Sequence, residues 1–285
     1  MASPWQDMKL AVLGCGFMGT AILQGLSKAE LHDTRLQMTA CVRSRSSLAR
    51  LEKMFNDAPV QCLQNNFTQA SEQSNVIILG VPPDQLQSLL GNDGLVQALR
   101  GKVIISLLAG VSCEDILQAL TTGNAAERHH FNVVRTIPTI ASKFLDSVTL
   151  LAQTTTAGEE HRRVAEWLLA QIGTVEVIPE SLMDTATAMG AACHALAVVG
   201  IEAAVDASVA EGLPRDLALA IAAKNIRSGA GLAVSGMTPE GIKSAMSIPH
   251  GITIHSFLEL ERGRVRGGIS DTVRHAIKYT NSMSS

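Results

Sequence analysis

The chain has 285 residues, of which 46% are hydrophobic, and a formal net charge of −3. This length suggests about two domains, the hydrophobic content argues against disorder, and the slight acidity argues against a general nucleic-acid binder. No uninterrupted apolar run reaches the roughly 18 residues of a membrane span, and residues 1–8 lack a signal-peptide apolar region. We therefore expect a cytoplasmic protein without a membrane or nucleic-acid partner.

The cysteine and histidine positions predict no metal site. The five cysteines are scattered along the chain, and no two form a C-x-x-C pair. This usage is typical of reduced thiols in the cytosol and argues against a disulfide framework. The histidines have neither the H-x-x-x-H nor the H-x-x-E-H spacing of a zinc site.

A glycine motif near the start of the chain predicts a dinucleotide site. An apolar run over residues 10–13 leads into G-x-G-x-x-G, and a helical apolar pattern follows. Gly14 permits a tight turn, Gly16 lets a pyrophosphate approach the main chain, and Gly19 lets the helix pack closely on the strand. The alternative is a glycine-rich turn without a ligand. The predicted cofactor contacts in this stretch are Gly14, Gly16, Phe17, Met18 and Gly19.

The end of the second expected strand, residues 37–42, bears on the choice of cofactor. An NAD site usually has an acidic residue there to bind the ribose 2′-hydroxyl. This chain instead has the sequence R-S-R-S, which suits a 2′-phosphate and favours NADPH over NADH. The alternatives are a solvated basic loop, or a helix cap supplied by Ser46 or Ser47. The predicted contacts are Arg43, Ser44 and Arg45.

Alternating strands and helices predict an α/β fold with a parallel sheet over the first half of the chain. Loops at the carboxyl ends of such strands bind ligands, so Val81, Pro82 and Ala109 are expected to line the cofactor channel, although they also fit plain strand exits. We therefore expect an N-terminal Rossmann-type dinucleotide-binding domain over residues 1–157. Its further β-rich runs are residues 75–83, 102–110, 131–138 and 148–152.

The second half of the chain is predicted to be an all-α C-terminal dimerisation domain, residues 158–285. A β-like segment at residues 174–178 is expected to close the sheet edge. An Ala- and Val-rich helical run then extends to about residue 211 and is expected to be buried almost all round. Because aromatic residues are scarce, we expect this half to pair with a second copy in a homodimer, the alternative being a self-contained bundle. Further helical patterns cover residues 217–234, 252–262 and 271–283.

Several stretches of the chain resemble the pyrroline-5-carboxylate reductases. The resemblance implies NADPH-dependent reduction of the C=N bond of a five-membered cyclic imine acid, with proline as the family product. It also implies a helical C-terminal domain that dimerises. The resembling stretches are residues 11–19, 105–111, 135–138, 211–218 and 247–261.

The resemblance assigns site residues in the second half. Thr253 matches the threonine whose hydroxyl faces the imine nitrogen, although it also fits a helix N-cap. The amides of Gly251, Ile252 and Thr253 open a helix and are expected to bind a substrate carboxylate. His250 and His194 stand where the family has Gly and Pro, so they either donate a proton or reshape the pocket. His194 also fits a satisfied core histidine.

These departures favour a small-molecule imine that differs from the family's usual one. The substrate loop reads Pro249-His250-Gly251 instead of P-G-G, and Pro82 replaces the lysine of V-K-P. The leading hypothesis is a cyclic imine reductase acting on pyrroline-5-carboxylate or a substituted pyrroline carboxylate. The alternatives are reduction of a C=O or C=C bond, a redox-neutral reaction, or a non-catalytic NADP-binding subunit.

Overall fold

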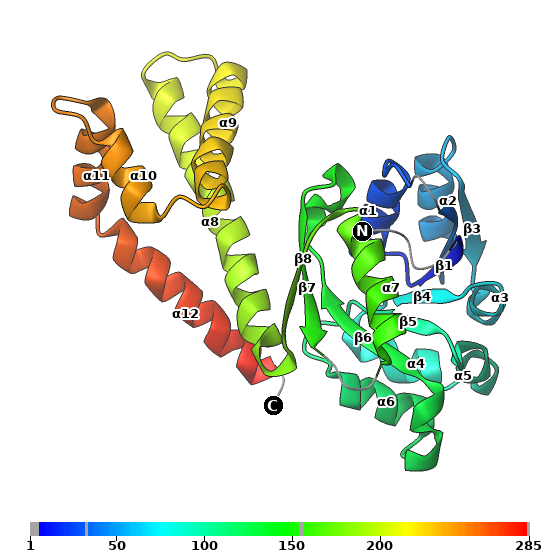
Figure 1. Cartoon of the computed structure of the whole chain (residues 1–285). Helices are drawn as coiled ribbons and strands as arrows, with labels where there is room; N and C mark the ends of the chain where they lie inside the picture. Colours follow the sequence, from blue (N-terminus) through cyan, green and yellow to red (C-terminus); the bar gives the residue numbers. More distant parts are fainter. Residues whose placement is uncertain (1–5, 32–33, 154–156, 284–285) are drawn as a thin grey trace. The chain divides into compact units, whose positions relative to one another are not determined.

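The computed structural model describes residues 6–31, 34–153 and 157–283. The chain divides into two compact units, Met1–Thr187 and Ala188–Met283. Each unit is described by itself below (Figure 1).

The first unit is built on an eight-stranded sheet in the order β3-β2-β1-β4-β5-β6-β7-β8. Neighbouring strands are parallel except for β6 and β7, which are antiparallel. The strand order reverses its direction between β1 and β4, and a doubly wound sheet binds nucleotides at such a point. The strands are β1 (Asp7–Leu13), β2 (Arg35–Val42), β3 (Val60–Gln64), β4 (Val76–Leu79), β5 (Val103–Ser106), β6 (Asn132–Ile137), β7 (Ser147–Gln153) and β8 (Gly173–Pro179).

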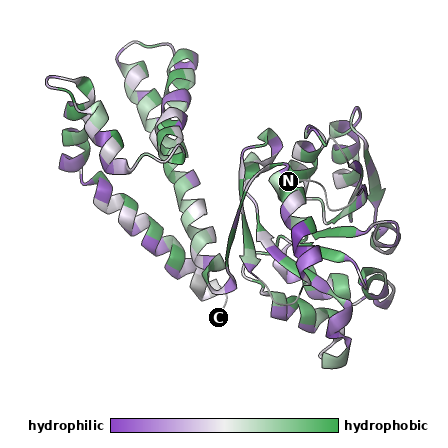
Figure 2. Ribbon diagram, in the orientation of Figure 1, coloured by the Kyte–Doolittle hydropathy of each residue, from purple (hydrophilic) through white to green (hydrophobic). Residues whose placement is uncertain are grey.

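Helices cover both faces of the sheet, because the central strands are apolar on both sides (Figure 2). In β4, Val76 and Ile78 pack in one core with α1, α2 and α7, while Ile77 and Leu79 pack in a second core with α3 to α6. The predicted Rossmann-type α/β fold is thus confirmed. These helices are α1 (Phe17–Leu26), α2 (Arg45–Met54), α3 (Phe67–Glu72), α4 (Leu86–Leu90), α5 (Asp93–Leu99), α6 (Cys113–Thr121) and α7 (Glu159–Ala170).

The first unit ends later than residue 157, where the sequence analysis placed the domain boundary. The helix α7 packs in the core beside the sheet, and β8 pairs with β7 over its whole length. The division therefore falls between Thr187 and Ala188, within the long helix α8. The β-like segment at residues 174–178 does form the edge strand that the sequence predicted.

The second unit is helical, as expected, but its helices are more exposed in the single chain than predicted. Within the described part of this unit, the buried residues are Ala188, Ala192, Val205 and Ala218. The prediction that α8 is buried almost all round is therefore wrong for the single chain, because the buried residues of this helix are Met183, Ala188, Ala192 and Val205. The helices are α8 (Met183–Ala210), α9 (Arg215–Val234), α10 (Pro239–Met246), α11 (Ile252–Arg262) and α12 (Val265–Met283).

Two helices, residues 180–210 and 215–234, are long and apolar enough to cross a bilayer by length and composition alone. The sequence analysis did not find these helices, because it looked for uninterrupted apolar runs. Single polar residues interrupt such a run without lowering its mean hydropathy much (Figure 2). Core helices of globular proteins pass the same test, so this finding is a weak indication of a membrane span.

Candidate functional site

The glycine loop after β1 has the geometry that the sequence predicted. Gly14 has a φ of +81°, and an added Cβ would lie 2.4 Å from Val81 Cγ1 and 2.7 Å from Val81 N. An added Cβ on Gly19 would lie 2.7 Å from Val12 Cγ1, so this glycine does allow close packing of α1 on β1. Both glycines are therefore required by the protein's own backbone and packing.

Gly16 differs from the other two glycines. A Cβ added to Gly16 would meet no described atom closer than Gly14 O at 3.9 Å. Gly16 is the N-cap of α1, and the amides of the first helical turn have no partner within the helix. The open space at Gly16 and these amides fit a pyrophosphate at the helix start.

A cavity of about 670 Å³ lies beside this loop. This volume is within the usual range for a small-molecule or cofactor site. Nine of the predicted cofactor residues line it: Gly14, Gly16, Phe17, Met18, Arg43, Ser44, Val81, Pro82 and Ala109. Within the described part of the chain, Gly19 and Arg45 do not belong to the lining.

The start of α2 presents cations and hydroxyls next to the cavity. Ser44 is the N-cap, and its Oγ accepts a hydrogen bond from Ser47 N at 3.2 Å. The expectation that Ser46 or Ser47 caps this helix is therefore wrong. Among residues 6–31, 34–153 and 157–283, the guanidinium groups of Arg43 and Arg45 have no hydrogen-bond or ion-pair partner and are exposed. They are available to an anionic ligand.

Sequence reasoning missed one wall of the cavity. Strand β3 ends at Gln64, and Asn65 follows with a φ of +50°. The strand was not predicted because its sequence, V-Q-C-L-Q, is half polar and lies at the edge of the sheet. The rule that ligands bind at the carboxyl ends of parallel strands would have found this wall once β3 was assigned. The missed lining residues include Asn65, Phe67, Ser88, Asn92 and Leu107.

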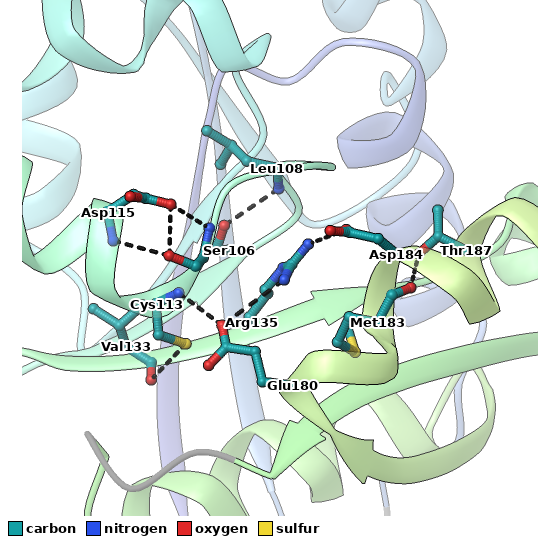
Figure 3. Close-up of polar contacts among 11 residues, drawn as sticks. Ser106, Leu108, Cys113, Asp115, Val133, Arg135, Glu180, Met183, Asp184 and Thr187 are labelled. Atoms are coloured by element: carbon teal, nitrogen blue, oxygen red, sulfur yellow. Dashed lines mark hydrogen bonds and ion pairs between the residues drawn. The ribbon is translucent and has the colours of Figure 1, made fainter. Parts of the chain in front are cut away.

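A charged network surrounds the buried side chain of Arg135 on β6 (Figure 3). The guanidinium of Arg135 donates from Nη2 to Asp184 Oδ1 at 2.6 Å, and its Nη1 lies 3.8 Å from Glu180 Oε1. Glu180 Oε1 also accepts a hydrogen bond from Cys113 N, at the start of α6, at 2.8 Å. One buried arginine therefore connects β6 with the segment that leads into α8, and through Glu180 with α6.

The loop between β5 and α6 is held at its β5 end as well. The hydroxyl of Thr136 donates to Ser106 O at 3.2 Å. Leu108 N donates to Ser106 Oγ at 3.2 Å (Figure 3). Leu107 and Ala109 of this loop line the cavity. The polar contacts around Arg135 thus support one wall of the candidate cofactor site.

The second group of predicted site residues lies in the second unit, at the start of α11. Gly251 is the N-cap of this helix and has no side-chain cap, so the reading of Thr253 as the N-cap is wrong. Thr253 is half-buried, and its hydroxyl has no hydrogen-bond partner in the part of the chain that the structure describes. Ile252 is exposed. The hydroxyl of Thr253 is thus available to a ligand.

The turn before α11 explains two residues of the substrate loop. Gly251 N donates to Ile248 O at 3.0 Å, and an added Cβ on Gly251 would lie 2.8 Å from Ile248 Cγ1. His250 has a φ of +59°, which an L-residue adopts at a cost of about 1–2 kcal/mol. Proline followed by a residue with positive φ is typical of a type II turn, in which glycine is favoured at the position of His250.

The other predicted histidine, His194, lies on α8. It is exposed in the single chain, and its Nδ1 lies 3.0 Å from Gly190 O in the preceding helical turn. The interpretation of His194 as a core histidine is therefore wrong for the single chain.

Comparisons with known proteins agree with this architecture. A family model described as NADP oxidoreductase coenzyme F420-dependent matches residues 9–110, and one described as pyrroline-5-carboxylate reductase dimerisation matches residues 180–283. A pyrroline-5-carboxylate reductase of Lophium arboricola is 34% identical, with 96% of this chain and 93% of the relative covered. The chain belongs to the pyrroline-5-carboxylate reductase family. A second reductase, from Neurospora crassa, is 32% identical, with 95% of this chain and 91% of the relative covered.

A solved structure of a pyrroline carboxylate reductase agrees in fold. The Plasmodium falciparum protein, with NADP bound, aligns with a TM-score of 0.81 and 19% identity, covering 98% of this chain and 99% of that one. The 34% identity with the Lophium arboricola relative confirms the sequence resemblance to the pyrroline-5-carboxylate reductase family over nearly the whole chain. His250 takes a positive φ that suits a glycine, the residue that the resemblance implies for this position.

Proposed function

We propose that this protein is an NADPH-dependent reductase of a cyclic imine, acting on pyrroline-5-carboxylate to form proline. The observation that carries the proposal is the match to pyrroline-5-carboxylate reductases along almost the entire chain, at 34% identity with one relative. The cavity beside the glycine loop supports a dinucleotide as cofactor, because it extends from the open space at Gly16 to the exposed Arg43.

NADPH fits the residues present around the cavity. The amides at the start of α1 would hold the pyrophosphate, while Arg43, Ser44 and Arg45 would hold the 2′-phosphate. The walls at Val81, Pro82 and Ala109 would hold the remainder of the dinucleotide. When bound, NADPH supplies the hydride for the reduction.

The cofactor preference can be tested at the start of α2. We expect Arg43→Ala combined with Arg45→Ala to raise the Kd for NADPH by about twentyfold and to leave the Kd for NADH nearly unchanged, since each charge-assisted hydrogen bond to a phosphate contributes about 1.5–3 kcal/mol in a solvent-shielded site and less at an exposed one. Quenching of nucleotide fluorescence measures both constants. Equal weakening of the two cofactors would contradict the assignment of the 2′-phosphate site.

At the substrate end, we propose that the residues at the start of α11 bind and orient the imine. The Thr253 hydroxyl would hydrogen-bond the imine nitrogen, where negative charge develops as the carbon receives hydride. The amides of Gly251, Ile252 and Thr253 would hold the substrate carboxylate. His250 or His194 would supply the proton to the nitrogen.

The activity is tested by mixing the purified chain with NADPH and pyrroline-5-carboxylate and following the loss of absorbance at the nicotinamide band. Proline formation that accompanies the absorbance loss would support the proposal. Turnover of ketones or enones in place of imines would favour reduction of a C=O or C=C bond. NADPH binding without turnover of any of these would favour a non-catalytic subunit.

A substituted pyrroline carboxylate is a second candidate substrate, and His250 favours it. This residue occupies a turn position at which glycine is less strained, so its imidazole is expected to have a function that offsets the cost. A larger side chain in the substrate loop would change which substituents the imine can carry.

We expect His250→Gly to leave the unfolding temperature unchanged or to raise it, because glycine relieves the positive φ. If His250 donates the proton, His250→Gly and His250→Asn both lower kcat, because neither side chain can supply an acidic proton. Steady-state rates of the parent, His250→Gly and His250→Asn measure the effect. An unchanged kcat with altered KM values would assign His250 to substrate selection instead.

We also propose that the chain forms a homodimer through its second unit. The dimerisation family model matches residues 180–283, and this unit buries few of its apolar residues by itself. A self-contained bundle would bury more of them. Light scattering on the purified chain tests the mass of the assembly. The cysteines form no disulfide in the part of the chain that the structure describes, which supports a cytoplasmic location.

A further inference from the structure

Arg50 of α2 reaches back to the glycine loop after β1. Its Nη2 donates to Cys15 O at 3.0 Å, and its Nη1 donates to Thr20 Oγ1 at 3.2 Å. Cys15 is the residue between the first two glycines of the motif, and Thr20 lies in the first turns of α1. The two donors of one guanidinium therefore connect α2 to both ends of the turn that opens α1.

The Thr20 hydroxyl extends this contact to Gly16. It donates to Gly16 O at 2.5 Å while it accepts from Arg50. Because its single proton is used for Gly16 O, the Cys15 thiol is left to donate to Thr20 Oγ1, which lies 3.7 Å from Cys15 Sγ. Cys15 is completely buried, and burial raises the pKa of its thiol to about 11, so the thiol stays protonated at neutral pH.

We propose that Arg50 is a positioning residue for the dinucleotide. Its hydrogen bonds to Cys15 O and Thr20 Oγ1 hold the glycine loop in its binding conformation, and Arg50 does not contact the ligand. We call these two hydrogen bonds the clamp. The inference rests on the proposed cofactor site. Arg50 does not belong to the described lining of the cavity, whereas Cys15 and Gly16 do. Because Arg43 and Ser44 at the start of α2 also line the cavity, the clamp fixes the span between the pyrophosphate and 2′-phosphate ends of the site. A loop held in its binding conformation loses less entropy when the ligand arrives.

The clamp predicts a different cofactor response from that of the 2′-phosphate residues. We expect Arg50→Met to raise the Kd for NADPH and for NADH by a similar factor of about ten, since the loop meets the pyrophosphate that both cofactors share. Arg50→Lys is expected to weaken both cofactors as well, because an ammonium cannot reproduce the two-pronged geometry of a guanidinium. Lys53→Met is the matched control: it removes one exposed positive charge from the same helix and should leave both constants unchanged.

The outcomes separate the clamp from simple electrostatic attraction. Loss of NADPH binding alone in Arg50→Met would mean that Arg50 acts on the 2′-phosphate, and full rescue by Arg50→Lys would mean that only its charge counts. Either result, or unchanged constants in a variant with the parent's unfolding temperature, would overturn the proposal.

A second measurement needs no cofactor. In the parent, Cys15 should resist alkylation because it is buried and protonated. In Arg50→Met, site-resolved mass spectrometry should show at least a tenfold faster alkylation of Cys15, with Lys53→Met behaving as the parent. If the parent binds neither nucleotide, the proposed function fails, while Cys15 alkylation still decides whether Arg50 clamps the loop. An unchanged alkylation rate in Arg50→Met would contradict the clamp.

Discussion

Thr253→Ala is expected to lower kcat for imine reduction by about a hundredfold, with a smaller change in the KM for NADPH. Removal of one donor aimed at developing negative charge typically costs about two to three orders of magnitude in rate. The hydroxyl is free for this task, because the helix cap of α11 is Gly251 and no described group bonds to Thr253 Oγ1. Steady-state rates with pyrroline-5-carboxylate measure the effect.

The controls for Thr253 lie on the same helix. Thr253→Ser keeps the hydroxyl and should retain most of the activity. Ser256→Ala removes a hydroxyl that donates to Ile252 O at 3.0 Å, and it should leave kcat close to that of the parent. Because Thr253 caps nothing, the unfolding temperature of Thr253→Ala should also stay close to the parent's. A Thr253→Ala variant with the kcat of the parent would contradict the proposed role of the Thr253 hydroxyl.

The second large effect concerns the carboxylates around Arg135. The Arg135 side chain is 4% exposed, whereas the side chains of Glu180 and Asp184 are 30% and 29% exposed. Removing both negative charges with Glu180→Gln and Asp184→Asn leaves a buried guanidinium without a counter-charge. Breaking a buried pair in this way typically costs about 3–5 kcal/mol, which for a unit of this size lowers the unfolding temperature by about 10 °C.

Arg135→Met is expected to lower the unfolding temperature less than the double carboxylate variant does. The methionine fills the buried site with an apolar chain, and the two half-buried carboxylates can be hydrated. Glu159→Gln is the control for an exposed ion pair. Glu159 pairs with Arg162 and Arg163 at a site where its own side chain is 57% exposed, so its loss should leave the unfolding temperature nearly unchanged.

Thermal unfolding followed by circular dichroism at one fixed protein concentration measures all these variants, since the proposed dimer would make the midpoint depend on concentration. We attribute the destabilisation to a buried guanidinium without a counter-charge. This interpretation would be wrong if Arg135→Met lowered the unfolding temperature more than the double carboxylate variant. The same variants also test the cavity wall, because Glu180 Oε1 accepts from Cys113 N at the end of the loop that carries Ala109.

The features predicted correctly from the sequence arise from contacts between residues close in the chain. The turn at Gly14 to Gly19 could be recognised because a strand, a turn and a helix follow one another within twenty residues. The buried strands β4 and β5 were visible as short apolar runs, since a strand covered on both faces must be apolar on both. The bounds of α11 were predicted to the residue, because a turn with proline and glycine precedes it and a glycine follows it.

The features that were missed depend on residues far apart in the chain. Strand β3 carries a half-polar sequence and exists as a strand because it pairs with β2. The expected boundary after residue 157 assigned α7 and β8 to the second domain, whereas their place in the first unit follows from their packing on distant strands.

The sequence by itself determined the family, the strand–turn–helix motif of the glycine loop and nine of the residues that line the cavity. These features depend on short local patterns of glycine, charge and apolar spacing. Only the tertiary structure revealed the contacts of Arg135 with Asp184, 49 residues away, and of Arg50 with Cys15, 35 residues away. It also assigned the positive φ to His250. No local pattern encodes such contacts, since they form only when the folded chain brings separate elements together.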